Sequence, residues 1–245
     1  MSESLDSNIQ KIALVTGASR GIGLAIVKEL ISLGYHVIGL CRHPEKTSFQ
    51  HDRFKLYAID LTNEKSLLKL PDLISEWDKI SLLVSNAGVG YFAPIEEMKI
   101  EQIVELTKIQ MLAPILLTKL LTRQMKEKKG RMIFIGSVSG ENISPWGNVY
   151  GANKAGLHHF VREIYSELRK YEVGIHLLIP DIVKSDFYES LSFSPDDDLR
   201  AFLEPEDVAK LVNLILTTKE NVQIMEVKIA PKLFKIKRRG SKAGL

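Results

Sequence analysis

Short apolar runs rich in β-branched residues alternate along the whole chain with longer segments of helical periodicity. Residues 11–15 predict a buried strand, and apolar residues from Ile22 to Leu33 then follow the three-and-four spacing of a helix closed by Gly34. The same alternation predicts strands at residues 36–40, 54–59, 80–84, 132–135, 174–179 and 222–229, and helices at 64–77, 100–125, 150–171 and 205–217. Crossovers of this length join parallel strands, and strands that are apolar throughout are buried on both faces. The pattern predicts an α/β fold: a doubly wound parallel sheet of seven strands with helices on both faces.

The chain is expected to form a single domain. Its 245 residues suit one large domain or two small ones, and no Pro/Ser-rich linker, internal repeat or composition shift interrupts it before residue 230. We predict a flexible N-terminus at residues 1–10, one domain at 11–231 and a basic C-terminal tail at 232–245.

The basic tail accounts for the positive charge of the chain. Of the 33 Lys and Arg residues, six lie at 232–245, which holds none of the 30 Asp and Glu residues. The rest of the chain is slightly acidic, so a nucleic-acid-binding core is not expected. The tail itself either contacts an acidic partner, an anionic membrane surface or nucleic acid, or is a solvated end without a partner, which is the favoured reading.

The remaining composition indicates a cytoplasmic protein without a metal. Cys41 is the single cysteine, the first ten residues lack the basic-then-apolar order of a secretory signal, and no apolar stretch is long enough to span a membrane. His158 and His159 are adjacent on a predicted helix and point in different directions, and no His, Cys and carboxylate set has zinc spacing.

A glycine-rich turn, TGASRGIG at residues 16–23, separates the first predicted strand from the first predicted helix. Glycine lets the chain turn tightly and lets the backbone approach a pyrophosphate, whose charge is met by N–H groups at the helix N-terminus. The turn therefore predicts a dinucleotide site, and the alternative is a glycine-rich turn with no ligand.

The spacing Gly-x-x-x-Gly-x-Gly resembles that of the short-chain dehydrogenase/reductase family. Two further family landmarks follow in order: Asp60-Leu61 after the third predicted strand, and Asn86-Ala87-Gly88 after the fourth, with Ser85 in place of the family's first asparagine. The resemblance covers about residues 11–231 and implies a Rossmann-fold oxidoreductase that binds a nicotinamide dinucleotide. It assigns cofactor binding to Gly17, Ser19, Arg20, Gly21, Ile22, Gly23, Asp60, Leu61, Asn86, Ala87 and Gly88.

Charge at the end of the second predicted strand predicts which dinucleotide binds. NAD enzymes place an acid there against the ribose 2′-OH, whereas NADP enzymes use arginine against the 2′-phosphate. Here the strand is followed by Arg42, the nearest acid, Glu45, lies past the strand, and Arg20 lies in the glycine turn. Two guanidinium groups can hold a phosphate bidentately, so NADP(H) is the predicted cofactor. The alternative is that both arginines are solvated surface charges.

Tyr150 and Lys154 are four residues apart on a predicted helix, which puts both side chains on one face. Ser137 lies thirteen residues before Tyr150, the family's spacing between catalytic serine and tyrosine. By resemblance, Tyr150 is the acid/base, Lys154 lowers its pKa and holds the nicotinamide ribose, and Ser137 polarises the carbonyl. Ser139 is the competing serine and is expected to line the substrate pocket.

Residues 180–185 resemble the family segment that usually begins Pro-Gly and ends in threonine. The resemblance assigns Pro180, Ile182 and Ser185 to the cofactor, with Asp181 in place of the glycine. The aromatic and acidic stretch that follows, residues 186–204, suits a substrate lid, and the alternative is an ordered connection packed on the body.

Gln110 stands where the family has an asparagine, four residues before Pro114. In the family that carboxamide helps to hold a water that joins the catalytic lysine to solvent. Glutamine carries the same groups on a side chain one methylene longer, and it can replace the asparagine only if the helix shifts. Gln110 is therefore expected to lie within reach of a water or of Lys154.

The leading hypothesis is an NADPH-dependent reductase of a small-molecule carbonyl, or the reverse alcohol dehydrogenase. The first alternative is a 3-oxoacyl thioester reductase, in which Lys128, Lys129, Arg169 and Lys170 would meet an acidic carrier protein. The second is a non-catalytic NADPH-binding protein, which the departures at Gln110 and Asp181 keep open. The resemblance also implies a homotetramer or homodimer formed through the predicted helices 100–125 and 150–171.

Overall fold

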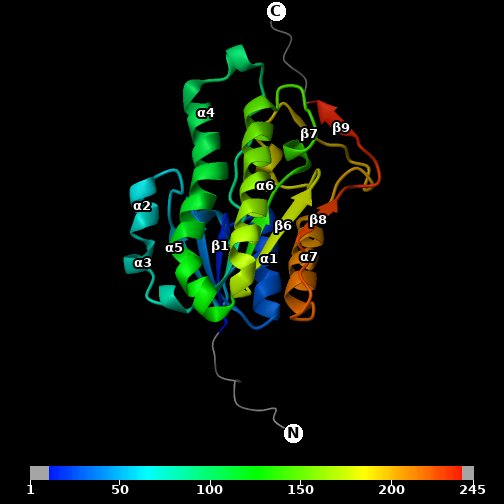
Figure 1. The fold of residues 1–245 in the computed structure, drawn as a ribbon. Helices are drawn as coiled ribbons and strands as arrows, with labels where there is room; N and C mark the ends of the chain where they lie inside the picture. Colours follow the sequence, from blue (N-terminus) through cyan, green and yellow to red (C-terminus); the bar gives the residue numbers. More distant parts are fainter. Residues whose placement is uncertain (1–10, 239–245) are drawn as a thin grey trace, which may run out of the picture.

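The computed structural model describes residues 11–238, so the predicted segment 1–10 and the end of the predicted tail, 239–245, lie outside the described residues. Figure 1 shows the fold. The strands are β1 (Ile12–Thr16), β2 (His36–Cys41), β3 (Phe54–Ala58), β4 (Ile80–Ser85), β5 (Arg131–Ile135), β6 (Gly174–Pro180), β7 (Phe193–Pro195), β8 (Glu226–Ile229) and β9 (Ile236–Arg238). The α-helices are α1 (Gly21–Ser32), α2 (Glu64–Leu68), α3 (Leu70–Leu73), α4 (Ile100–Thr107), α5 (Ala113–Lys128), α6 (Asn148–Leu168) and α7 (Pro205–Thr217).

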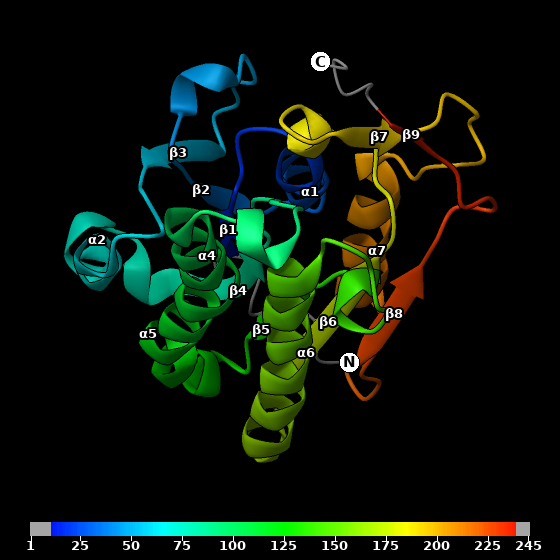
Figure 2. The same cartoon turned by 90° about the horizontal axis from the view of Figure 1, so that it is seen from above.

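Seven of the strands form one parallel sheet in the order β3-β2-β1-β4-β5-β6-β8. Side chains alternate between its two faces, so Leu14 and Leu83 pack under α5 and α6 while Val15 and Val84 pack under α1 and α7. Figure 2, which looks down on the upper end of the sheet, shows the two helical layers on opposite faces. The predicted single-domain, doubly wound seven-stranded sheet is confirmed.

Two predicted helices are interrupted, and proline explains both interruptions. The helix predicted at 64–77 divides into α2 and α3 because Pro71 has no N–H to donate to the carbonyl of Leu67. The helix predicted at 100–125 divides into α4 and α5 around a π-helical turn, Lys108–Leu112. Pro114, just after this turn, cannot donate to the carbonyl of Gln110, and the wider turn places Gln110 in the interior.

The last strand of the main sheet is shorter than predicted. Residues 222–229 were expected to pair throughout, but β8 begins only at Glu226. The residues before it reach β6 partly through side chains: Gln223 donates to the carbonyl of Ile175, and His176 contacts the carbonyl of Ile224 through Nδ1 at 2.6 Å. These bonds replace part of a regular ladder.

The predicted tail contains a strand. Residues 236–238 form β9, which pairs antiparallel with β7 from the predicted lid in a separate two-stranded sheet. Lys235 and Lys237 form ion pairs with Asp196 and Asp197 of the same chain. Up to Arg238, therefore, the segment expected to be a flexible tail folds back on the body, and its acidic partner is internal.

We expect Phe134→Ala to lower the free energy of unfolding by about 3–5 kcal/mol, because Phe134 is fully buried in β5 and packs edge-on against Phe160. Urea denaturation measures the change. Leu199→Ala, at a position that is 80% exposed, is the control and should change stability by less than about 0.5 kcal/mol. Equal effects of the two substitutions would contradict this account of the core.

Candidate active site

A cleft of about 330 Å³ opens at the carboxyl ends of the parallel strands. It lies where the strand order reverses between β1 and β4, the position at which doubly wound sheets bind ligands. Its walls come from the loops that follow the first six strands of the chain, β1 to β6, together with the start of α6. The sheet thus brings to one edge residues that are far apart in the sequence.

The glycine turn after β1 is held by contacts that a larger residue would disturb. Gly17 has φ +66°, and a Cβ there would lie 2.9 Å from Nδ2 of Asn86. A Cβ on Gly23 would lie 2.0 Å from the carbonyl oxygen of Gly17, so Gly23 allows α1 to begin directly against the turn. Arg20 provides no side-chain cap, and the first-turn N–H groups of α1 remain available to an anion.

Asn86 joins the loop after β4 to the loop after β1. The hydroxyl of Thr16 accepts hydrogen bonds from the backbone N–H groups of Asn86 and Ala87 at 2.9 and 3.0 Å. The carboxamide of Asn86 donates to the carbonyl of Thr16 at 3.0 Å. These bonds fix the floor of the cleft at the point where the two neighbouring strands send their loops in opposite directions.

Arg20 and Arg42 both line the cleft, and both form ion pairs that the sequence did not reveal. Arg42 contacts Glu105 of α4 at 2.8 Å, and Arg20 contacts Asp186 at 3.4 Å and Glu189 at 3.3 Å. These acids come from distant segments, so the charge pattern at the end of the second strand does not reveal them. Exposed pairs of this kind contribute about 1 kcal/mol or less, so a phosphate can replace the carboxylates at small cost.

Most of the predicted site residues line this one cleft. They are Gly17, Ser19, Arg20, Gly21, Ile22, Arg42, Leu61, Asn86, Ala87, Gly88, Ser137, Tyr150, Lys154, Pro180 and Ser185. Five predicted residues are not among its lining residues: Gly23 packs on Gly17, Asp60 accepts hydrogen bonds from Thr62, Ile182 is buried, Gln110 donates to the carbonyl of Val89, and Ser139, which was expected to line the substrate pocket, donates its backbone N–H to the hydroxyl of Ser137. Sequence reasoning missed Lys46 and Asp181, which also line it.

Tyr150 and Lys154 are buried on the same face of α6. The Lys154 ammonium donates to the carbonyl of Ile135 at 2.9 Å and lies 5.9 Å from the centre of the Tyr150 ring. Burial raises the pKa of Tyr150 to about 12, with a hydrogen bond to Ser137 acting in the opposite direction. Burial also lowers the pKa of Lys154 to about 8. The pKa of Tyr150 is therefore raised by desolvation, and not lowered as expected from Lys154.

His158 supports Ser137 and was considered only as a metal ligand from the sequence. Its Nε2 accepts the backbone N–H of Ser137 at 3.3 Å, and burial lowers the pKa of its imidazole to about 4. The neutral ring therefore carries its proton on Nδ1. The sequence signal is its spacing: His158 follows Lys154 by one helical turn and so faces the same way.

Gln110 donates its Nε2 to the carbonyl of Val89 at 2.5 Å. Its Oε1 is buried with no hydrogen-bond partner in the described part of the chain. Gln110 lies within the π-helical turn Lys108–Leu112. Its observed partner is a wall residue of the cleft, Val89.

Asp181, in place of the family's glycine, is half buried beside the cleft. Burial raises the pKa of its carboxyl group, and its charge in turn contributes to a raised pKa of Tyr188. Within residues 11–238, no group of three or more His, Cys, Asp or Glu side chains is placed to hold a metal ion. No helix of the same described range has the length and apolar character needed to cross a membrane.

The chain belongs to the short-chain dehydrogenase family, whose model matches residues 11–194. It is 27% identical over 233 residues to a probable NADP-dependent dehydrogenase of Haemophilus influenzae, covering 89% of this chain and 92% of the relative. It is 31% identical over 217 residues to the 3-oxoacyl-[acyl-carrier-protein] reductase of the same organism, covering 82% and 88%. A solved metagenomic short-chain oxidoreductase in complex with NADP has a TM-score of 0.78 and 31% identity, covering 93% of this chain and 100% of that one. The chain is therefore a short-chain oxidoreductase.

The low pKa of Lys154 predicts how stability depends on pH. The folded protein releases the Lys154 proton near pH 8, whereas the unfolded chain keeps it to about pH 10.5. Between these values the unfolded state binds more protons, so this residue makes stability rise with pH by up to about 1.4 kcal/mol per unit. We expect the unfolding free energy of wild type minus that of Lys154→Met to increase from pH 8 to pH 10.

Urea denaturation at several pH values measures this difference. The matched control is Lys119→Met, at an exposed position on α5, for which the difference should stay flat over the same range. A flat difference for Lys154→Met would show that its ammonium is solvated.

Proposed function

We propose that the protein reduces a carbonyl group of a small molecule with NADPH, or oxidises the corresponding alcohol, with Tyr150 as proton donor. The supporting observation is one cleft that contains both a buried Tyr150–Lys154 pair and the cationic Arg42. Arg42 follows β2 and Ser137 follows β5, three strands along in the sheet order. At about 4.8 Å per strand the two lie about 14 Å apart, which suits the two ends of an extended dinucleotide.

Residues of the cleft suit both the pyrophosphate and the 2′-phosphate of NADP(H). Gly17 and the uncapped start of α1 would face the pyrophosphate, and Arg20, Arg42 and Lys46 would face the 2′-phosphate. NADP(H)-dependent relatives among the comparisons support this cofactor. When bound, the nicotinamide supplies or accepts the hydride.

The raised pKa of Tyr150 suits the reductive direction. A phenol with a pKa of about 12 keeps its proton at neutral pH and can donate it to the alkoxide that develops as the carbonyl is reduced. Ser137, held at its backbone by His158, would donate a hydrogen bond to the same oxygen as charge builds. Lys154 would return a proton to Tyr150, and the unpartnered Oε1 of Gln110 is an acceptor available to such a relay.

The basic residues predicted to bind an acyl carrier protein lie far from Tyr150, which disfavours the acyl-carrier alternative. Lys128, Lys129, Arg169 and Lys170 lie at the C-terminal ends of α5 and α6, the lower end of the molecule in Figure 1, whereas Tyr150 is near the upper end of α6. The 21 residues of α6 separate the two ends by about 30 Å. A carrier bound there is poorly placed to deliver its thioester. The presence of Ser137, Tyr150 and Lys154 in one cleft also disfavours a non-catalytic NADPH-binding protein.

We further propose that the protein forms a homodimer or homotetramer and lies in the reducing environment of the cytoplasm. Helices α4 and α6 contact one another within the chain, and Ile100 and Val104 of α4 are exposed. Apolar side chains on neighbouring helices suit a subunit interface. Cys41 is buried, in keeping with a chain that does not rely on disulfides.

Tyr150→Phe should reduce turnover of carbonyl substrates by at least about a hundredfold, because only the transferable proton is lost and the ring still packs. NADPH oxidation over a panel of aldehydes, diketones, steroids and sugars gives the rate, and fluorescence titration gives the Kd of NADPH, which should stay within about twofold. A variant with near wild-type turnover would mean that another group is the acid.

Arg42→Ala should weaken NADPH binding about tenfold or more while leaving NADH binding nearly unchanged, because the 2′-phosphate is the only part of the cofactor that the guanidinium would contact. Calorimetry with both nucleotides measures the two affinities. Arg162→Ala is the matched control, since Arg162 forms its ion pair with Glu226 on β8. Unchanged NADPH affinity in Arg42→Ala would remove this residue from the cofactor site.

A further inference from the structure

Five aromatic rings form a closed circuit that includes the ring of Tyr150. Its neighbours in the circuit are Phe92, with ring centroids 5.1 Å apart, and Phe187, at 5.9 Å. Phe187 contacts Tyr188, Tyr188 contacts Phe193, and Phe193 returns to Phe92 at 5.2 Å. Three of the rings line the cleft, those of Tyr150, Phe187 and Tyr188, while Phe92 and Phe193 lie behind them. We call these five residues the aromatic wall.

The position of Phe187 depends on a glycine. A Cβ at Gly90 would lie 2.4 Å from the tip of the Phe187 ring, so the ring packs directly on the backbone of the loop after β4. Phe187 comes from the predicted lid, at the short 3₁₀ turn Asp186–Tyr188. The lid is therefore seated on the catalytic tyrosine.

The C-terminal strand supports one side of the aromatic wall. Phe193 lies in β7, and β9 pairs with β7 so that Phe193 is opposite Arg238. Backbone hydrogen bonds extend the attachment beyond the Pro195–Ile236 end of the pair: Asp196 donates to the carbonyl of Lys235 at 3.2 Å, and Leu233 donates to that of Arg200 at 2.8 Å. A three-residue strand with one partner is weak by itself, so other contacts must hold it.

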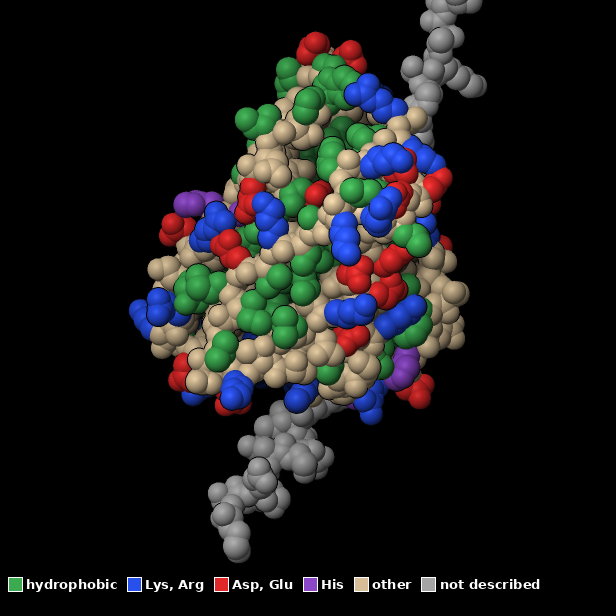
Figure 3. Space-filling model, turned by 90° about the vertical axis from the view of Figure 1, so that its right-hand side faces the viewer, with side chains coloured by type: hydrophobic (Ala, Val, Ile, Leu, Met, Phe, Trp, Pro, Cys, Tyr) green, Lys and Arg blue, Asp and Glu red, His purple; other side chains and the backbone are tan. Residues whose placement is uncertain are grey.

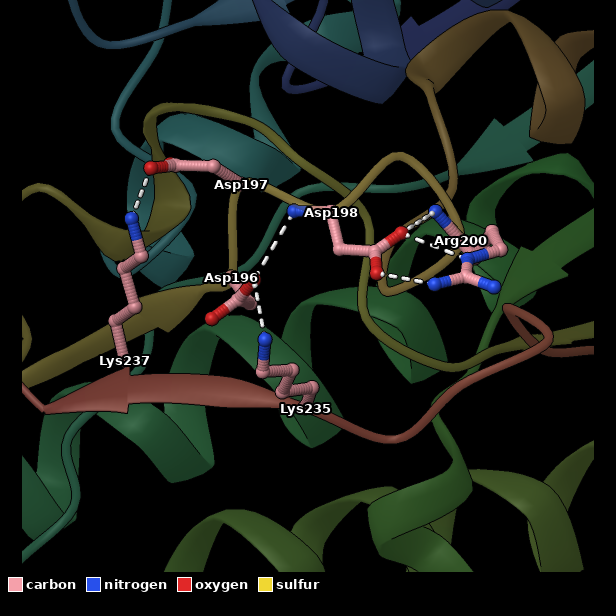
Figure 4. Close-up of polar contacts among 6 residues, drawn as sticks. All are labelled: Asp196, Asp197, Asp198, Arg200, Lys235 and Lys237. Atoms are coloured by element: carbon pink, nitrogen blue, oxygen red, sulfur yellow. Dashed lines mark hydrogen bonds and ion pairs between the residues drawn. The ribbon is translucent and has the colours of Figure 1, made fainter.

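Ion pairs supply these contacts, as Figure 4 shows. Lys235 contacts Asp196 at 3.2 Å, and Lys237 contacts Asp197. Asp198 turns the other way and pairs with Arg200 at 2.8 Å. On this side of the molecule, Figure 3 shows basic and acidic side chains next to one another near the start of the grey C-terminal trace. The acids of the lid and the bases of the tail are thus matched across the β7–β9 pair.

The same strand also contacts a support of the neighbouring ring, that of Phe92. The guanidinium of Arg238 lies over the Trp146 ring, 5.9 Å from its centre. The carbonyl of Trp146 accepts the N–H of Ala93 at 3.0 Å, which fixes the loop that carries Phe92. β9 therefore contacts supports of both Phe193 and Phe92, and it sets the spacing between them.

The wall defines what a substrate must offer. Any group beside the reacting carbonyl has to enter among rings that already contact one another, and a flat apolar group restores the ring contacts that it displaces. A methyl group is too small to restore these ring contacts. The carboxyl group of Asp181, beside the same cleft, opposes an anionic substituent.

We propose that the aromatic wall is the substrate subsite for an uncharged aryl group next to the carbonyl, and that the C-terminal strand β9 is the element that positions it. This inference rests on the proposed function for its chemistry. Lys235 and Lys237 are positioning residues, because they act on the substrate only through β7 and Phe193.

The test compares two diketones that differ by one group: diacetyl, with a methyl, and acetylbenzoyl, with a phenyl. Wild type should favour acetylbenzoyl in kcat/KM by about tenfold or more. Reversing both charges, Lys235→Glu with Lys237→Glu, should lower this preference by about fivefold or more, mainly through KM for acetylbenzoyl. The kcat for diacetyl and the Kd of NADPH should stay within about twofold.

Three further variants sharpen the test. Lys237→Asp should lower the preference, and adding Asp197→Lys should restore it, since the pair is then re-formed with its charges exchanged. Phe193→Leu keeps an apolar side chain without a ring and should lower the preference directly. The control, Lys65→Glu with Lys119→Glu, changes the net charge equally at exposed positions on α2 and α5 and should leave the preference unchanged.

Binding of acetylbenzoyl to the NADPH complex, measured by saturation-transfer NMR, separates the two proposals. Turnover with a preference that the β9 and Phe193 variants do not change would overturn the inference and leave the proposed function intact. No turnover, but acetylbenzoyl binding that those variants weaken, would overturn the function and support the subsite. A preference for diacetyl, or for the ammonium-bearing aminoacetone, would also overturn the aryl assignment.

Discussion

The hydrogen bonds from Asn86 and Ala87 to the hydroxyl of Thr16 hold the rest of the site together. They lie where β1 and β4 are neighbours but their following segments separate to opposite faces of the sheet. A parallel sheet ends all its strands at one edge, so the loops there must share space without regular pairing. The hydroxyl of Thr16 joins the two loops instead, and the glycine turn can then approach the Asn86 carboxamide closely. The cleft exists because these two loops are tied at their base.

The sequence predicts what depends on local periodicity and motif position. Apolar runs locate the sheet strands, and the loops after β1, β4 and β5 place Gly17, Asn86 and Ser137 at one edge. It does not predict contacts between distant segments: Glu105 against Arg42, or β9 against β7, because charge and short strands carry no record of their partners. The prediction of a helix end is wrong where a single residue determines it, as Pro71 does at the end of α2.

Desolvation governs the chemical end of the cleft more strongly than charge. Tyr150 and Lys154 are close enough to interact, yet burial shifts both toward their neutral forms. The Lys154 ammonium donates to the carbonyl of Ile135, and within residues 11–238 no carboxylate forms an ion pair with it. Such a site reduces stability in exchange for reactivity, and the surrounding core of β5 and α6 has to compensate for it.

Ion pairs attach the segment predicted as a lid at two places along its length. Near its start Asp186 and Glu189 contact Arg20, and near its middle Asp196 and Asp197 contact the bases of β9. Each such pair is screened by solvent and is worth about 1 kcal/mol or less, so several together select one position without locking it. The aromatic contacts between these places are apolar and unscreened. Ordering of the lid over Tyr150 therefore depends mainly on ring packing, whereas its attachment to the cofactor loop and to the C-terminal strand is electrostatic and easily exchanged.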